Sequence, residues 1–182
     1  GSEEVVRRAD IAMYKSKESG RGRAFFYDMS MDNDRETILA LESQLRQAIE
    51  RNELSVVFQP VVAASSLDVS SVETLIRWNR PERGPVSPDI FIPVAEKTGL
   101  IEPLGVFVLR SACERAQEWP DINIAVNISP VQLRNPSFAN QVADILEAAG
   151  IEPSRLTLEL TEGYLIQNPQ RARQSIERLK TL

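Results

Sequence analysis

The sequence contains no histidine and a single cysteine, Cys113, among its 182 residues. Without histidine, the chain cannot form a Ser-His-Asp triad, a Cys-His nucleophile pair or a histidine-ligated metal site. One cysteine allows neither an internal disulfide nor a cysteine-cluster zinc site. Any chemistry must therefore use carboxylates, amides, hydroxyls, lysine and arginine, or a hard cation bound through oxygen.

Long apolar runs and an excess of positive charge are missing as well. No stretch approaches the ~18 apolar residues of a membrane span, and no signal-peptide pattern occurs. The 21 basic and 26 acidic residues give a net charge of −5, which argues against a nucleic-acid polymer as partner. We expect a cytoplasmic domain with no membrane span in this chain, while its parent protein could be anchored to a membrane through other segments. Gly1 and Ser2 are typical of a cloning remnant.

The N-terminal part has the pattern of a helix over residues 3–19 and of a short strand over 23–27. One helix and one strand cannot bury a core, so this part is expected to be the end of a larger domain. The polar residues 30–35 are predicted to form a junction. A second helix is expected over residues 36–51.

Four strands are expected after that helix, at residues 54–62, 70–78, 122–128 and 155–161. Only seven residues separate the first two strands, which is too short for a crossover helix, so they should run antiparallel. Helices are predicted at residues 104–119, 136–149 and 169–182, between and after the later strands. Strand–helix–strand connections of this length make the later strands parallel. The fold class is therefore α/β, as a small open sheet or as part of a βα barrel.

Alternation along the strands brings three polar side chains to one place. Asn127 and Glu159 lie on the faces of their strands that oppose the apolar residues, and Glu73 shares a face with Arg77. In a βα barrel that face points inward, and active sites form at the carboxyl ends of the strands. Two carboxylates and an amide oxygen suit Mg²⁺ or Mn²⁺, and an arginine nearby could hold a phosphate.

Structural interpretations of the same residues stay open at this point. Glu73 and Arg77 could simply pair with each other inside the sheet. Asn127, which precedes Ile128-Ser129-Pro130, could belong only to a turn. Cys113 lies on a helix between small apolar residues and is expected in the core.

Five blocks of this sequence resemble the EAL domain family over residues 36–182. They are residues 58–62, 72–78, 91–101, 127–133 and 159–162. The resemblance implies a modified TIM-type barrel whose first strand is antiparallel, in agreement with the short link between the first two strands. It also implies a cyclic di-GMP phosphodiesterase that forms linear 5′-pGpG with Mg²⁺ or Mn²⁺.

The resemblance assigns a role to each matching residue. Glu73, Asn127 and Glu159 would be metal ligands, with Glu73 central to catalysis. The cyclic di-GMP contacts would come from Gln59, Leu75 and Arg77. Glu162 would brace a loop at the active site rather than bind metal.

The first residues resemble a second family. Residues 9–17 and 20–23 are similar to the last helix and strand of a GGDEF domain, which implies a tandem GGDEF–EAL signalling protein. The expected division is therefore residues 3–31 as a GGDEF remnant and residues 32–182 as the first half of an EAL domain. This remnant lacks the signature loop of its family and could not make cyclic di-GMP.

The sequence departs from the EAL pattern in two ways. Thr74 replaces the alanine of the motif, but it lies on the strand face opposite Glu73, so only packing should suffer. The family's Asp-Asp pair and its later lysine and glutamate are absent from the 182 residues. We therefore expect this half barrel to self-associate through its exposed edge and to be inactive alone. A cyclic di-GMP receptor or a dimerisation module on a degenerate EAL domain is the alternative.

Overall fold

The structure is a computed structural model that describes residues 5–6, 8–10, 12–13, 16, 24–64, 66–160 and 169–181. Side chains of residues 29–36 and 169–172 are outside the description. The chain divides into two compact units, Gly1–Gln44 and Leu45–Leu182. Each unit is described by itself.

The N-terminal unit agrees only in part with the sequence prediction. Its described residues between 5 and 16 are helical, as expected. Residues 24–28 form neither helix nor strand, so the strand predicted over 23–27 is wrong for the described part. Helix α2, Met29–Glu50, includes the polar residues predicted as a junction. That run contains no proline or glycine, and polar residues alone do not end a helix.

The second unit is built on one five-stranded sheet. Its strands are β1 (Leu54–Val62), β2 (Val69–Arg80), β3 (Gly84–Val86), β4 (Asn123–Ile128) and β5 (Leu156–Leu160). The order is β1-β2-β4-β5, with β3 paired to the far end of β2. β1 and β2 are antiparallel, which confirms the predicted hairpin, and β2, β4 and β5 run parallel. β3 was not predicted, because three residues are too few to show alternation.

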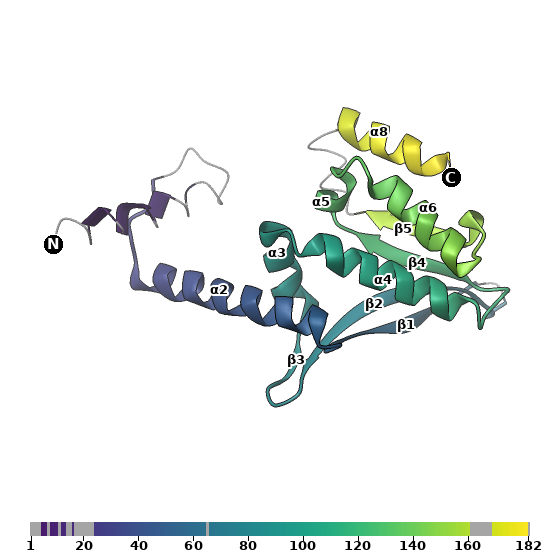
Figure 1. The fold of residues 1–182 in the computed structure, drawn as a ribbon, viewed down its shortest axis with the longest axis horizontal. Coiled ribbons are helices and arrows are strands. Elements are labelled where there is room, and N and C mark those ends of the chain that lie inside the picture. Colours follow the sequence, from purple (N-terminus) through teal and green to yellow (C-terminus); the bar gives the residue numbers. More distant parts are fainter. Residues whose placement is uncertain are drawn as a thin grey trace. The chain divides into compact units, whose positions relative to one another are not determined.

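Helices cover one face of this sheet. They are α3 (Pro88–Thr98), α4 (Ile101–Ala116), α5 (Pro130–Leu133), α6 (Phe138–Ala149) and α8 (Pro169–Lys180), with a short 3₁₀ turn η1 (Pro153–Arg155). Figure 1 shows α4 and α6 side by side across the sheet. α3 was not predicted, since Pro93 interrupts its pattern. None of the helices in the described part of the chain could cross a membrane.

The core lies between the sheet and these two helices. Ile124 and Val126 of β4 are at most 1% exposed, and they pack against a cluster that includes Ala112 and Cys113 of α4. Burial of the Cys113 thiol, with a smaller contribution from the charge of Glu114, raises its pKa to about 11. The thiol therefore stays protonated in the core near neutral pH, as expected for a packing residue.

Arg155, just before β5, forms hydrogen bonds to the backbone of the segment that connects α4 to β4. Its Nη2 donates hydrogen bonds to the carbonyls of Ala116, Trp119 and Ile122 at 3.1, 2.6 and 2.8 Å. These carbonyls belong to the end of α4 and the turn after it, where helical partners run out. The half-buried guanidinium thus joins segments that are more than thirty residues apart in sequence.

We predict that Arg155→Met lowers the free energy of unfolding by about 2 kcal/mol, because hydrogen bonds to a charged group are lost from a partly buried site. Arg115→Met is the matched control, since its ion pair with Glu118 is about half exposed on both sides (53% and 52%). That control should cost about 0.5 kcal/mol or less. Urea denaturation measures both variants, and equal losses would contradict the prediction.

Candidate active site

The two faces of β2 and β4 differ sharply in chemistry. Val72 and Thr74 of β2 are buried against the helices, while Glu73, Leu75 and Arg77 occupy the opposite face. In β4, Asn127 lies on the face opposite its buried isoleucines and valine. This is the alternation that the sequence pattern indicated.

The strand register brings the three polar side chains together. Glu73 lies opposite Ala125, two residues before Asn127 on β4, and Asn127 lies opposite Glu159 on β5. Asn127 Nδ2 donates a hydrogen bond to Glu73 Oε1 at 2.7 Å. Three neighbouring strands therefore present Glu73, Asn127 and Glu159 on one face of the sheet.

A structural ion pair between Glu73 and Arg77 does not form among the described side chains. Arg77 Nη1 instead donates to the carbonyl of Ile76 at 2.9 Å, and Glu73 accepts from Asn127. Arg77 is exposed, so its remaining donors can reach a ligand over the sheet.

A cavity of about 660 Å³ opens beside these residues. The β2–β4 ladder ends at Thr74 and Val126, and beyond that point β2 continues toward β3. The cavity forms at this divergence, at the carboxyl ends of the parallel strands, where ligands of α/β sheets bind. Its lining includes polar side chains from both the sheet and the helices: Arg77, Asp89, Glu96, Asn127, Ser129 and Glu159.

The donor set fits a hard divalent cation. Two carboxylates and one amide are oxygen donors of the kind that Mg²⁺ and Mn²⁺ prefer. The hydrogen bond from Asn127 engages Nδ2, so Oδ1 is not used in it. No group of three or more acidic, histidine or cysteine side chains suited to a metal occurs among the described residues. A site of three protein ligands here would therefore take its third oxygen from the Asn127 amide.

The other residues assigned by resemblance lie in different places. Gln59 of β1 lies opposite Glu73, so both share the same face. Leu75 is half-buried and lines the cavity. Glu162 lies outside the described residues.

The turn after β4 was predicted as an alternative role for Asn127, but other residues form it. Ser129 Oγ accepts from the Val131 backbone at 3.1 Å, and Gln132 Oε1 accepts from the Ser129 backbone at 3.0 Å. These are the two halves of a capping box at the start of α5. Neither residue was predicted in this role, although Ser-x-x-Gln is the known pattern of such a box.

The chain belongs to the EAL domain family, whose sequence model matches residues 42–182. The bifunctional diguanylate cyclase/cyclic di-GMP phosphodiesterase MucR of Pseudomonas aeruginosa is 37% identical over 98% of this chain and 27% of its own length. The cyclic di-GMP phosphodiesterase PdeR of Escherichia coli is 35% identical, with coverage of 98% and 27%. The chain thus spans about a quarter of these relatives.

Solved structures show the same fold. The MucR phosphodiesterase in complex with cyclic di-GMP superposes with a TM-score of 0.74 at 37% identity, over 78% of this chain and 60% of that one. The FimX EAL domain of Pseudomonas aeruginosa bound to cyclic di-GMP gives 0.70 at 26% identity, over 79% and 58%. The strands described above therefore belong to the TIM-like barrel of EAL domains, with an antiparallel first strand.

Thr74, the replacement for the motif alanine, is 3% exposed and faces the helices as expected. Its Oγ1 has no hydrogen-bond partner among the described residues. An unpaired buried hydroxyl reduces stability, because it loses its hydrogen bond to water and gains none in return.

We predict that Thr74→Val raises the free energy of unfolding by about 1 kcal/mol, since a methyl group replaces the unpaired hydroxyl at equal volume. Thr98→Val is the control, because the Thr98 hydroxyl donates to the Val94 carbonyl at 2.9 Å. That variant should lose stability. Thermal unfolding of both proteins tests this difference, and a loss in Thr74→Val would show that its hydroxyl has a partner.

Proposed function

We propose that this chain is part of a cyclic di-GMP phosphodiesterase that hydrolyses one phosphodiester bond with Mg²⁺ or Mn²⁺ and forms linear 5′-pGpG. The observation that carries the proposal is the convergence of Glu73, Asn127 and Glu159 beside the cavity. The names of MucR and PdeR, and the cyclic di-GMP held by the MucR structure, support the choice of substrate.

The metal site would consist of Glu73, Asn127 and Glu159. A bound divalent cation would lower the pKa of a water molecule and offset negative charge on the phosphoryl oxygens. The hydrogen bond from Asn127 holds the Glu73 carboxylate in place, so two of the ligands are oriented before a cation arrives. Glu159, next to Asn127 in register, completes the set from β5.

The dinucleotide would lie along the same face of the sheet. Arg77 would bind a phosphate through its guanidinium, which matches phosphate geometry. Leu75 supplies an apolar contact for a base, and Gln59 adds a polar one from β1. Glu162 is proposed to brace the loop after β5.

We further propose that residues 3–31 come from a preceding GGDEF domain and that the parent protein acts in the cytoplasm. The family model begins at residue 42, whereas the MucR match extends over 98% of the chain. The similarity to a protein named as bifunctional therefore continues on the N-terminal side of the EAL region.

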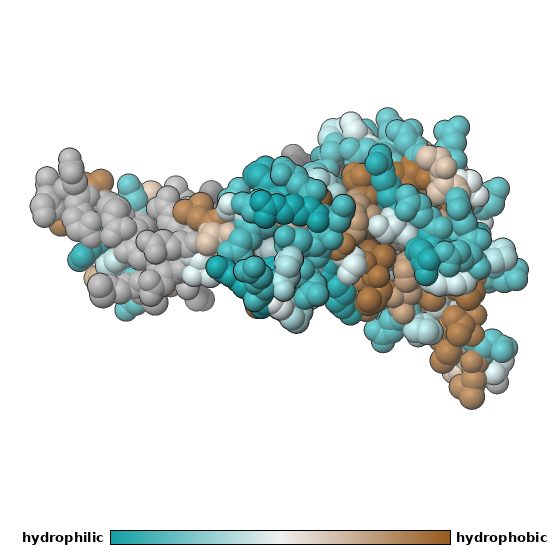
Figure 2. All heavy atoms as spheres, turned by 60° about the horizontal axis from the view of Figure 1, so that its bottom comes forward, coloured by the Kyte–Doolittle hydropathy of each residue, from teal (hydrophilic) through white to brown (hydrophobic). Residues whose placement is uncertain are grey.

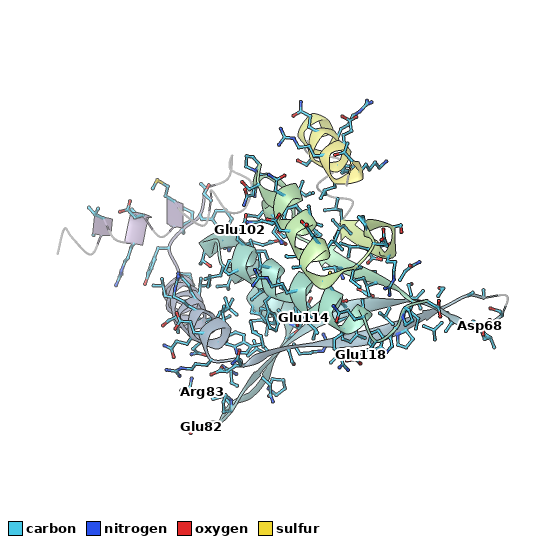
Figure 3. The ribbon with its side chains drawn as sticks, turned by 45° about the vertical axis from the view of Figure 1, so that its right-hand side comes forward. Asp68, Glu82, Arg83, Glu102, Glu114 and Glu118 are labelled. Atoms are coloured by element: carbon cyan, nitrogen blue, oxygen red, sulfur yellow. The ribbon has the colours of Figure 1, made fainter. Side chains whose placement is uncertain are left out.

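We expect Glu73→Ala to abolish hydrolysis of cyclic di-GMP in the full-length protein that contains these residues. The variant removes a ligand and the acceptor of Asn127, while the half-exposed position should change the free energy of unfolding by about 1 kcal/mol or less. Product formation by chromatography and thermal unfolding are the measurements. Glu82→Ala is the control, because Glu82 lies exposed in the β2–β3 turn (Figure 3) and does not line the cavity.

Unchanged turnover in Glu73→Ala would remove this residue from the mechanism. Binding of cyclic di-GMP without hydrolysis by the unmodified protein would favour the receptor alternative.

The edges of the sheet support the proposed self-association of the 182 residues. β1 and β5 each pair with one neighbour only among the described strands. Four apolar residues at the β1–β2 hairpin are 41–75% exposed: Val61, Val62, Leu67 and Val69. Figure 2, in which hydrophobic residues are brown, shows an apolar patch at this hairpin, at the lower right. Unpaired edges and exposed apolar patches bind other copies.

We predict that the isolated 182-residue chain forms dimers or larger species in light scattering and that Val62→Glu shifts it toward monomer. A charge on an edge strand opposes pairing with a second copy. Leu39→Glu changes an apolar residue of α2 that is similarly exposed (56%, against 49% for Val62), and it should leave the association unchanged. This chain should show no turnover, and its three protein ligands should hold a cation only weakly, since most of the remaining coordination would come from water. A monomeric wild-type chain, or metal-dependent turnover, would contradict these expectations.

A further inference from the structure

One side-chain hydrogen bond in the cavity wall joins α3 to the turn after β4. Ser129 Oγ donates to Glu96 Oε1 at 2.6 Å, across 33 residues of sequence. This distance is typical of a hydroxyl bound to an ionised carboxylate, which is roughly twice as strong as a neutral hydrogen bond. Glu96 thus adds a long-range hydrogen bond to Ser129, beyond the local bonds of the capping box of Ser129 and Gln132.

The turn that contains Ser129 is tightly packed. Ser129 is 8% exposed and Gln132 is 3% exposed. α4 makes room for the amide of Gln132 by having no side chain at Gly105, where a Cβ would collide with that amide. Ser129 is therefore held by its own turn, whose Gln132 packs against α4, and by Glu96 of α3.

Ser129 is two residues beyond Asn127 in the chain. Consecutive Cα atoms are 3.8 Å apart, so a fixed Ser129 restricts where the backbone of Asn127 can lie. On its other side, Asn127 donates to Glu73. Two hydrogen bonds and the short stretch of chain from Asn127 to Ser129 thus connect Glu96 to Glu73. Glu96, Asn127 and Ser129 line the same cavity.

We infer that Glu96 is a positioning residue, whose hydrogen bond to Ser129 holds the Asn127 amide in the geometry that the cation site needs. This inference rests on the proposed metal-dependent function, because it assigns a role around the same site. Glu96 acts through Ser129 and does not itself bind the cation. Removal of a group that orients a metal ligand typically weakens metal affinity by 10- to 100-fold.

The test measures Mn²⁺ binding in the full-length protein by the electron paramagnetic resonance of free Mn²⁺, without cyclic di-GMP. Glu96→Ala should weaken Mn²⁺ binding at least ~10-fold. Glu96→Gln retains an acceptor oxygen but loses the charge, and it should weaken binding about threefold. Ser129→Ala combined with Glu96→Ala should bind Mn²⁺ as Ser129→Ala does, because the two residues act through one contact.

Glu102→Ala is the matched control. Glu102 Oε2 accepts from Asn135 Nδ2 at 3.0 Å, also across 33 residues, but Asn135 lies beyond the turn that carries Ser129. Glu102 is at the start of α4 (Figure 3). Its loss removes a similar long-range contact and should leave Mn²⁺ binding unchanged.

Unchanged Mn²⁺ affinity in Glu96→Ala, equal weakening in Glu102→Ala, or no Mn²⁺ binding by the wild type would overturn the inference. If Glu96→Ala does not fold, the comparison of Glu96→Gln with Glu102→Gln decides. Hydrolysis is measured separately. A wild-type protein whose Mn²⁺ binding depends on Glu96 but which does not cleave cyclic di-GMP would refute the proposed function and leave the inference intact.

Discussion

The alternation of side chains along β2 and β4 is the constraint on which the rest of the structure depends. On one face, Val72, Ile124 and Val126 pack against the helices and supply the core. On the other, Glu73 and Asn127 meet above the sheet. A shift of one residue in either strand would exchange these faces, burying the charge and exposing the core. The hydrophobic burial that stabilises the core therefore also fixes the strand register that brings Glu73 and Asn127 together.

The cavity forms beside β2 because this strand pairs with different neighbours along its length. β2 pairs with β1 along its length, with β4 near its start and with β3 near its end. Because β4 and β3 use different parts of β2, the sheet opens between them. α3 and the turn after β4 border this opening, so the cavity lies where residues from β2, β4 and β5 can meet.

A small number of long-range hydrogen bonds sets the orientation of polar groups, which hydrophobic packing does not determine. Arg155, just before β5, binds the end of α4, and Glu96 of α3 binds the turn after β4. Hydrophobic burial is non-directional, so it brings elements together without setting the orientation of a polar side chain. Directed hydrogen bonds of charged groups supply that orientation, at the end of a helix in one case and beside the candidate site in the other.

The sequence by itself determined which residues share a strand face and that β1 and β2 form an antiparallel hairpin, because alternation and loop length are local properties. It also indicated Glu73, Asn127 and Glu159 as a set. Only the tertiary structure decided that Asn127 donates a hydrogen bond to Glu73 instead of forming a turn, and that Glu96 accepts one from Ser129. It also decided that α3 forms with Pro93 inside it and that residues 24–28 are not a strand. Those outcomes depend on contacts between residues far apart in the chain, which no local period encodes.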